Sequence, residues 1–203
     1  MDDLKVDLNF KGFTSTRLKI RRFRPEDAPS LQAYREDPEV AMYQYWSTCT
    51  LSEAQEFVET QARQTADIQG EWLQIAVECL HSKEHLGDIA FRTCPSSLDT
   101  TFFGASFSRR AQGKGYASEA LAHLFYYLFE QRNKRRLVGI TDCRNEASVR
   151  LLERLGFRRE AHFIENLEFK GELVSEYLYA LLRKDWPSSP AFRIYLQSRR
   201  ENS

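Results

Sequence analysis

Apolar and polar positions alternate over several short stretches of this chain and recur at helical spacing over others. The alternating stretches predict strands at residues 17–23, 72–80, 86–92, 101–107, 137–141, 157–164 and 172–182. Apolar residues three and four positions apart, together with helix start signals, predict helices at residues 25–36, 50–65, 115–131 and 145–155.

The order of these elements, β-α-α-β-β-β-α-β-α-β-β, predicts a mixed α/β domain. Its sheet is expected to be mostly antiparallel, with one β-α-β crossover in the middle of the chain. Thr50 and Glu53 have the spacing of a capping box at the start of the second helix. Pro38 is expected to end the first helix, because proline is poorly tolerated inside one.

The chain of 203 residues has the length of one domain with a sizeable core. A Pro-Ser-Ser-Pro run at residues 187–190 marks the expected end of that domain. We therefore predict an N-terminal segment at residues 1–15, a domain at residues 16–186 and a C-terminal tail at residues 187–203. The FRIYL segment of the tail is expected to pair with a second copy or to lie on its own domain.

The 29 basic and 29 acidic side chains balance, so the formal net charge is zero. A general nucleic-acid binder normally carries a basic excess, because phosphate neutralisation supplies most of its affinity, and we expect no nucleic-acid partner. No apolar run reaches the ~18 residues of a membrane helix, so no membrane partner is expected either. The start of the chain, MDDLKVDLNF, lacks the basic and apolar regions of a secretory signal.

Cysteines and histidines are scattered along the chain, and no two cysteines form a Cys-x-x-Cys pair. This distribution argues against a zinc site and a disulfide framework, and we expect no metal. It fits the reducing cytoplasm, which is the expected location. The cysteines are Cys49, Cys79, Cys94 and Cys143.

The most informative stretch is SRRAQGKGYASEA, residues 108–120, which lies between a predicted strand and a predicted helix. Free backbone N–H groups at a helix N-terminus, together with the helix dipole, attract an anion. Gly113 and Gly115 would let the backbone approach that anion and adopt positive φ angles. Because arginine and lysine side chains add positive charge, a phosphate or pyrophosphate group is the natural ligand of this loop.

Three known phosphate loops compete for this stretch. A P-loop needs Gly-x-x-x-x-Gly-Lys-Ser/Thr, and here Lys114 is followed by Gly115. A dinucleotide loop needs Gly-x-Gly-x-x-Gly, and here position 118 is serine. Arg110-x-x-Gly113-x-Gly115 agrees with the third, the Arg/Gln-x-x-Gly-x-Gly/Ala loop of the GCN5-related N-acetyltransferases. A helix-entry loop that merely contains two glycines is the alternative.

Residues 17–186 resemble the GCN5-related N-acetyltransferase (GNAT) superfamily, and within it the RimJ/RimL-like branch that acetylates ribosomal-protein N-termini and related amines. The resemblance implies the acyl-CoA N-acyltransferase fold, a mixed α/β fold with helices on both faces of the sheet. In that fold two central strands splay apart and acetyl-CoA lies between them. The segments that carry the resemblance are TRL at 16–18 with RFRPED at 22–27, GASF at 104–107, QGKGYASEA at 112–120, and NEAS at 145–148 with LGF at 155–157.

The resemblance also implies which residues would bind acetyl-CoA. The backbone of Phe107 and Ser108 would pair with the pantetheine arm like an added strand. Asn145 would bond the cofactor's amide arm or a bound water, although its oxygen is equally suited to cap its own helix. The pyrophosphate would lie among Arg109, Arg110, Gln112, Gly113, Lys114, Gly115, Tyr116 and Ala117. For the two arginines a solvated position is the alternative, and for the tyrosine it is core packing.

Direct transfer to a neutral amine, which the resemblance implies, needs a base for the amine and an acid for the leaving thiolate. The helix at 145–155 lacks the tyrosine that many relatives use as acid, and Ser148 stands where the ribosomal branch has a serine near the sulfur. Phe102 occupies the place of a common glutamate base, which leaves Glu165 and Glu168 as candidates. The alternatives are a first-turn helix hydroxyl for Ser148 and surface salt bridges for the glutamates.

Three aromatic residues close together predict one wall of the acceptor pocket, with a packed loop as the alternative. They are Tyr43, Tyr45 and Trp46. The last two strands would form the opposite wall. Cys143 is expected to be structural, because no histidine accompanies it and direct transfer needs no covalent intermediate.

Together these observations predict an acetyl-CoA-dependent N-acetyltransferase whose acceptor is a primary amine on a protein N-terminus or a small molecule. The alternative is a non-enzymatic acyl-CoA-binding module that kept the fold, because the common glutamate and tyrosine are both missing. Nucleotide binding by the same loop is disfavoured, because the P-loop serine or threonine is absent. The resemblance leaves monomer and homodimer open.

Overall fold

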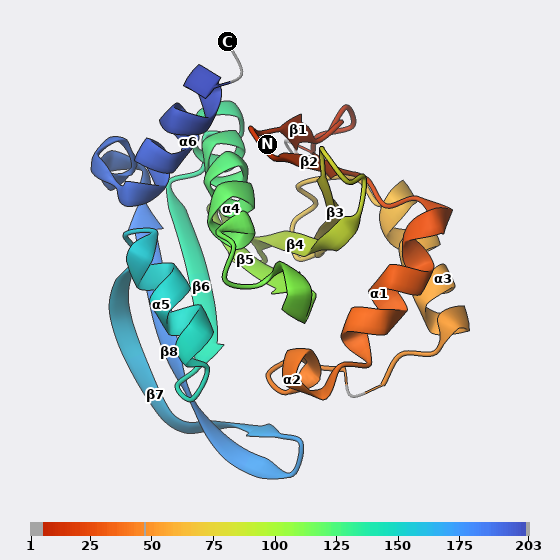
Figure 1. Ribbon diagram of the computed structural model, residues 1–203. Helices are drawn as coiled ribbons and strands as arrows, with labels where there is room; N and C mark the ends of the chain where they lie inside the picture. The colour runs from red at the N-terminus through yellow and green to blue at the C-terminus, as the bar shows by residue number, and fades with distance from the viewer. Residues whose placement is uncertain (1–5, 47, 202–203) are drawn as a thin grey trace.

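One sheet of eight strands runs through the computed structural model, which describes residues 6–46 and 48–201. Parts of the predicted N-terminal segment and tail, residues 1–5 and 202–203, lie outside the described residues. The strands lie side by side in the order β1-β2-β3-β4-β5-β6-β8-β7 (Figure 1). In chain order they are β1 (Phe13–Thr14), β2 (Leu18–Arg21), β3 (Leu73–Cys79), β4 (His85–Cys94), β5 (Ser97–Phe107), β6 (Arg136–Asp142), β7 (Arg158–Phe169) and β8 (Glu172–Leu182).

Helices cover both faces of this sheet, as the prediction required. The helices are α1 (Ala28–Arg35), α2 (Pro38–Ala41), α3 (Leu51–Arg63), α4 (Tyr116–Tyr126), α5 (Glu146–Arg154) and α6 (Pro190–Glu201). Residues of α1 and α3 share a core with Ala76 of β3, whereas α4 and α5 share one with Ile75 and Val77. Successive strand residues point to opposite faces, so the two helix pairs lie on opposite sides of the sheet. In the described part of the chain, no helix is both long and apolar enough to cross a membrane.

All neighbouring strands are antiparallel except β5 and β6, which α4 connects. This pair is the expected β-α-β crossover, and the mixed α/β class is confirmed. The capping box is also present, because the Glu53 N–H donates to Thr50 Oγ1 at 3.3 Å and Glu53 Oε2 accepts from the Thr50 N–H at 2.7 Å. Each predicted strand and helix has a counterpart in the structure.

Among the strands and α-helices of the described residues, three have no counterpart in the prediction: β1, α2 and α6. Pro38 follows the end of α1 and also opens α2, where Asp37 caps the new helix by accepting from the Glu39 N–H at 3.0 Å. Proline suits the first turn of a helix, because its missing N–H has no partner there. The helix predicted to reach residue 131 leaves the α form after Tyr126 and ends in one π-helical turn, Tyr127–Gln131.

The pairing between β5 and β6 ends early. Phe102 lies opposite Val138, and beyond that point β5 continues to Phe107 and β6 to Asp142 without pairing with each other. Each strand stays paired on its other edge, β5 with β4 and β6 with β8. The two strands therefore splay apart, as the resemblance implies.

Aromatic packing fixes the point where the strands part. The ring of Phe103 lies 4.8 Å from that of Phe125 and 5.1 Å from that of Phe157, measured between centroids. A Cβ atom added to Gly139 would lie 3.2 Å from the Phe103 ring and 2.9 Å from the Leu152 side chain. Gly139 therefore lets Phe103 and α5 pack directly against β6 at the start of the gap.

The segment beyond residue 187 lies on its own domain, where α6 runs beside α4 (Figure 1). The rings of Tyr195 and Tyr126 stack with centroids 4.1 Å apart. The Nε2 atom of His123 lies 3.0 Å from the hydroxyl of Ser198. FRIYL is thus part of an amphipathic helix whose apolar side covers α4.

Because His123 is buried in this contact, the stability of the fold should depend on pH. Burial, together with Arg199 and against Glu119, lowers the pKa of His123 from 6.5 to about 4. Between these values the unfolded chain binds a proton that the folded chain does not, so stability is complete above pH ~6.5 and falls as the pH drops towards 4. The loss from this one group should approach about 3 kcal/mol at 1.36 kcal/mol per pKa unit.

Urea unfolding at a series of pH values checks this expectation. The His123→Phe variant, which keeps a ring beside Phe13, should lose stability less steeply over this range. His81→Gln, at an exposed turn, should follow the wild type. A slope unchanged by His123→Phe would contradict the assignment.

Candidate active site

The loop between β5 and α4 contains two glycines with left-handed backbone. The φ angles of Gly113 and Gly115 are +71° and +80°, a region that favours glycine. Gly115 immediately precedes α4, and no side chain caps the helix there. A Cβ atom added to Gly113 would meet nothing within 4 Å, so the loop presents bare backbone at this point.

Backbone donors gather in the same place. Among the described residues, none accepts a hydrogen bond from the backbone N–H groups of residues 113–118. The positive end of the α4 dipole coincides with these donors. Unpaired donors, a helix N-terminus and exposed backbone together fit an anionic group, such as the phosphate or pyrophosphate predicted for this loop.

Two of the three cations in the loop have acidic neighbours. Arg109 Nη1 lies 2.9 Å from Glu39 Oε1, and Arg110 Nη2 lies 2.6 Å from Glu84 Oε1. Exposed ion pairs are weak, so a bound anion could compete for both guanidinium groups. Lys114 is exposed, and in the described part of the chain no acidic group pairs with its ammonium.

The end of β5 is tied to this loop. Phe107 is buried, and its carbonyl accepts from Gln112 Nε2 at 3.0 Å. The Ser108 N–H donates to the Leu86 carbonyl at 2.9 Å, while the Ser108 hydroxyl is buried without a partner among the described residues. The Gln112 side chain therefore fixes the loop to the strand. Its N–H donates to the Arg109 carbonyl at 3.1 Å, so the structure does not leave it free for the predicted diphosphate.

Asn145 caps α5, as its alternative interpretation suggested. Its Oδ1 accepts from the Ser148 N–H at 3.1 Å, so a contact with the cofactor would have to use Nδ2. The Ser148 hydroxyl is half-buried in the first turn of α5, and no described residue hydrogen-bonds to it. Asn145 and Ser148 thus share the N-terminal end of α5, a few residues after the end of β6.

The two candidate bases differ in placement. Glu165 lies in an irregular part of β7, with φ +46°, and its N–H donates to Ser175 Oγ at 2.9 Å. Glu168 lies on the opposite face of the hairpin from its neighbour Phe169. Both glutamates are exposed, and no basic group of the described chain pairs with either carboxylate.

The predicted acceptor aromatics meet the turn of the β7–β8 hairpin in a contact that we call the clasp. Lys170 Nζ donates to the carbonyl oxygens of Ala41 at 2.8 Å and Trp46 at 3.1 Å. The rings of Tyr45 and Phe169 pack edge to face with centroids 5.7 Å apart. The clasp joins the α2 loop to a hairpin more than a hundred residues later in the chain.

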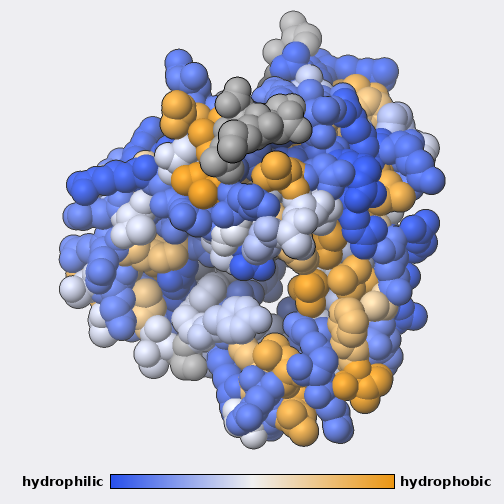
Figure 2. All heavy atoms as spheres, turned by 180° about the vertical axis from the view of Figure 1, so that it is seen from behind, coloured by the Kyte–Doolittle hydropathy of each residue, from blue (hydrophilic) through white to orange (hydrophobic). Residues whose placement is uncertain are grey.

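Tyr43 adds a third tie, because its hydroxyl donates to the Arg144 carbonyl at 3.1 Å, just before α5. The face seen from behind is hollowed near its centre (Figure 2). On β6, Ile140 is 44% exposed and points away from the face on which Gly139 meets Leu152 of α5. The loop that carries the predicted aromatics is therefore tied both to the hairpin turn and to the segment before α5.

Several side-chain contacts in this region could not be predicted from neighbouring residues in the sequence. The buried Arg35 guanidinium lies between two rings, with its Cζ 3.9 Å from the Phe57 centroid and 4.5 Å from that of Trp46. Tyr34 donates a hydrogen bond to Asp88, and burial raises the pKa of both side chains. These partners are distant in sequence, so only the fold brings them together.

Cys143 fits the structural role expected for it. Burial raises the pKa of its thiol, which favours the protonated form. A catalytic cysteine needs the opposite shift, because the thiolate is the nucleophile.

Comparisons with known proteins agree with this geometry. The family model described as "Acetyltransferase (GNAT) domain" matches residues 17–158. An uncharacterized N-acetyltransferase of Bacillus subtilis, YnaD, is 30% identical over 173 residues, which is 85% of this chain and 98% of the relative.

Solved structures agree as well. A GNAT-family acetyltransferase from Bacillus anthracis has a TM-score of 0.76 at 27% identity, covering 84% of this chain and 98% of its own. Spermidine N-acetyltransferase from Vibrio cholerae, solved with CoA and spermine, has a TM-score of 0.70 at 18% identity, covering 83% and 96%. The chain therefore belongs to the GNAT family of acetyltransferases, which transfer an acetyl group to an amine.

Proposed function

We propose that this acetyltransferase takes its acetyl group from acetyl-CoA and passes it directly to a primary amine on a peptide N-terminus or a small molecule. One observation carries the proposal: the unpaired N–H groups of residues 113–118 lie at the end of β5, the strand that splays from β6. The first feature suits a diphosphate and the second suits an extended arm that pairs like a strand. Acetyl-CoA contains both.

The donor side uses the residues predicted for it. The diphosphate would meet the backbone of Gly113 to Ala117 with Lys114, Arg109 and Arg110 as surrounding charge. The pantetheine arm would lie along the unpaired edge of β5 near Phe107. Ser108 would not pair with it, because the Ser108 N–H donates to Leu86 of β4 and the Ser108 carbonyl accepts from the Ala111 N–H. The presence of CoA in the solved spermidine N-acetyltransferase supports this choice of donor.

The chemistry assigns two side chains. Ser148 donates a hydrogen bond to the leaving sulfur, because its hydroxyl is unengaged at the helix end beside the splay. Glu165 or Glu168 accepts the proton of the amine, directly or through water. A backbone N–H near Phe107 stabilises the oxyanion.

The clasp favours an acceptor that enters the gap between β5 and β6 with its amine end first. Lys170 and Tyr45 close the rim between the α2 loop and the hairpin, so a slender amine reaches the splay more readily than an internal side chain of a folded protein. Both a flexible peptide N-terminus and a small polyamine are slender in this sense. The RimJ/RimL-like resemblance favours the peptide, and the spermidine enzyme with its spermine ligand favours the polyamine.

Thiol release from acetyl-CoA tests the function. The wild-type protein should release free thiol with at least one class among short peptides, polyamines, aminoglycosides and amino acids, and calorimetry should show CoA binding without any amine. CoA binding with no release for any class would favour the binding-module alternative. Absence of CoA binding would remove the basis of the proposal.

A charge at Gly113 tests the diphosphate position. Gly113→Asp and Gly113→Asn have the same shape, and both residue types tolerate positive φ. The aspartate should weaken CoA binding about tenfold more than the asparagine, because a like charge within several ångströms of the diphosphate costs at least about 1.4 kcal/mol. Calorimetry compares the two dissociation constants, and equal losses would place the diphosphate elsewhere.

Ser148→Ala tests the leaving-group role. The substitution should lower kcat about a hundredfold, as for a lost general acid, and leave the KM for acetyl-CoA unchanged. The cap of α5 should survive, because Asn145 accepts from the backbone N–H and not from the hydroxyl. Ser148→Thr retains the hydroxyl and should keep more activity. An unchanged kcat in the alanine variant would show that Ser148 has no role in the reaction beyond its place in the first turn of α5.

A further inference from the structure

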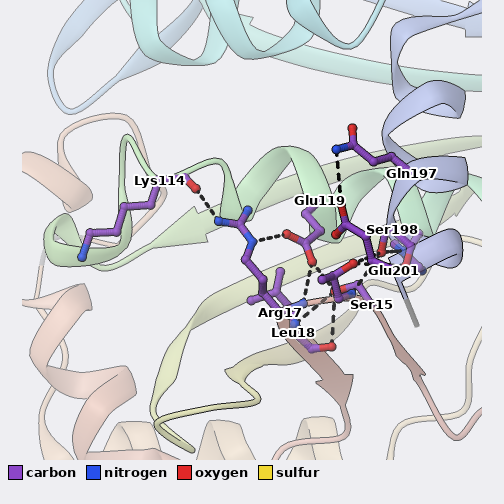
Figure 3. A network of polar contacts seen from close by, with 10 residues as sticks. Ser15, Arg17, Leu18, Lys114, Glu119, Gln197, Ser198 and Glu201 are labelled. Atoms are coloured by element: carbon purple, nitrogen blue, oxygen red, sulfur yellow. Dashed lines mark hydrogen bonds and ion pairs between the residues drawn. The ribbon is translucent and has the colours of Figure 1, made fainter. Parts of the chain in front are cut away.

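Arg17 connects the edge of the sheet to the diphosphate loop. It directly precedes β2, and its guanidinium reaches across to the start of α4 (Figure 3). Nη1 donates to the Lys114 carbonyl at 3.0 Å, and Nε donates to Glu119 Oε2 at 2.7 Å. Its Cζ also lies 4.7 Å from the centroid of the Tyr116 ring. One side chain thus touches the loop, the first residue of α4 and the first turn of that helix.

Glu119 holds Arg17 in this position. Its side chain is 7% exposed, and a buried carboxylate is stable only with a charged partner and further hydrogen bonds. Its Oε1 accepts from the Ser15 hydroxyl at 2.7 Å and from the Arg17 N–H at 2.9 Å. Since the carboxylate is fixed on both oxygens, the guanidinium that it binds is fixed as well.

The contact with the Lys114 carbonyl determines the orientation of the Lys114–Gly115 peptide unit. A trans peptide places its C=O and N–H on opposite sides. Because the Lys114 carbonyl points to Arg17, the N–H of Gly115 in the same peptide unit points away from Arg17, towards the open side of the loop. A Cβ atom added to Gly115 would lie 3.4 Å from Arg17 Nη2, so the guanidinium sits directly behind this backbone.

A carbonyl turned the other way would oppose an anion. Gly113 and Gly115, which flank Lys114, have left-handed backbone, and glycine backbone can rotate at low cost. An unrestrained peptide unit would therefore present its oxygen to the diphosphate in part of the population. Arg17 engages that oxygen before the ligand arrives, which reduces the ordering that binding requires.

We propose that Arg17, held by Glu119, is a positioning residue that orients the Lys114–Gly115 peptide so that its N–H faces the diphosphate of acetyl-CoA. The proposal rests on the proposed function, because it concerns the same donor site. Arg17 acts through the loop backbone and does not touch the ligand. Glu119 compensates the charge of Arg17, as expected for a residue that holds the loop and not for one that binds phosphate.

Calorimetry with CoA is the first test. Arg17→Met removes the donors and keeps much of the length, and it should weaken CoA binding about tenfold, the loss expected for one hydrogen bond to a charged group. Glu119→Gln keeps the shape and the Ser15 contact, and should give a smaller loss in the same direction. Arg135→Met is the matched control, because Arg135 makes a similar Nε contact with Asp99 at 2.8 Å outside the loop.

A shortened donor separates positioning from general stability. Acetyl-pantetheine keeps the thioester and the arm but lacks the diphosphate. With acetyl-CoA, Arg17→Met should raise KM about tenfold and change kcat little, whereas with acetyl-pantetheine variant and wild type should agree. Equal losses with both donors would show that Arg17 only stabilises the fold, which would overturn the proposal.

Arg17→Lys separates positioning from direct phosphate contact. A lysine cannot reproduce the fork that binds Lys114 and Glu119 together, so the loss should persist in this variant. Full recovery with lysine would indicate a simple charge on the phosphate and would overturn the proposal. If wild type binds no CoA, the proposed function itself fails; if wild type binds CoA and Arg17→Met binds it equally well, only the role of Arg17 fails.

Discussion

The splay of β5 from β6 is the constraint on which the rest of this structure depends. Two neighbouring strands that stop pairing leave backbone donors and acceptors without their usual partners, and such groups are costly when buried. The sheet tolerates this because each strand remains paired on its far edge, β5 with β4 and β6 with β8. The unpaired edges then face a gap that an extended ligand could enter, so the feature that weakens the sheet also provides the site that we propose for acetyl-CoA.

The same logic explains why the loop follows β5 directly. The chain leaves the open edge at Phe107, turns through residues 109–111 and enters α4, whose first N–H groups are also without partners. Two sets of unpaired backbone groups are therefore continuous along the chain. Gln112 fixes this turn from the strand side, and Arg17 contacts it from the side of β2. A ligand with an extended arm and a diphosphate, such as the acetyl-CoA that we propose, would satisfy both sets at once.

The order of elements and the donor loop could be predicted because their signals are local. Gly113, Gly115 and the helix spacing after them lie within a few residues of each other, and Thr50 with Glu53 fixes a helix start in the same way. The elements that escaped prediction depend on distant partners. The helix α6 depends on packing against α4, where Tyr195 stacks on Tyr126. Pro38 was expected only to end α1, because its position as the first residue of α2 depends on the cap that Asp37 provides.

The two sides of the site differ in the same respect. The donor side that we propose consists of short contiguous stretches, since acetyl-CoA presents the same diphosphate and arm to every enzyme that uses it. The acceptor side that we propose combines Tyr43, Tyr45 and Trp46 on one loop with Phe169 and Lys170 on a hairpin far along the chain. Its shape depends on how two surface segments meet, and either can change without disturbing the splay. A fold arranged in this way keeps its donor while its acceptor changes, which is why the sequence identifies the acetyl source more firmly than the amine.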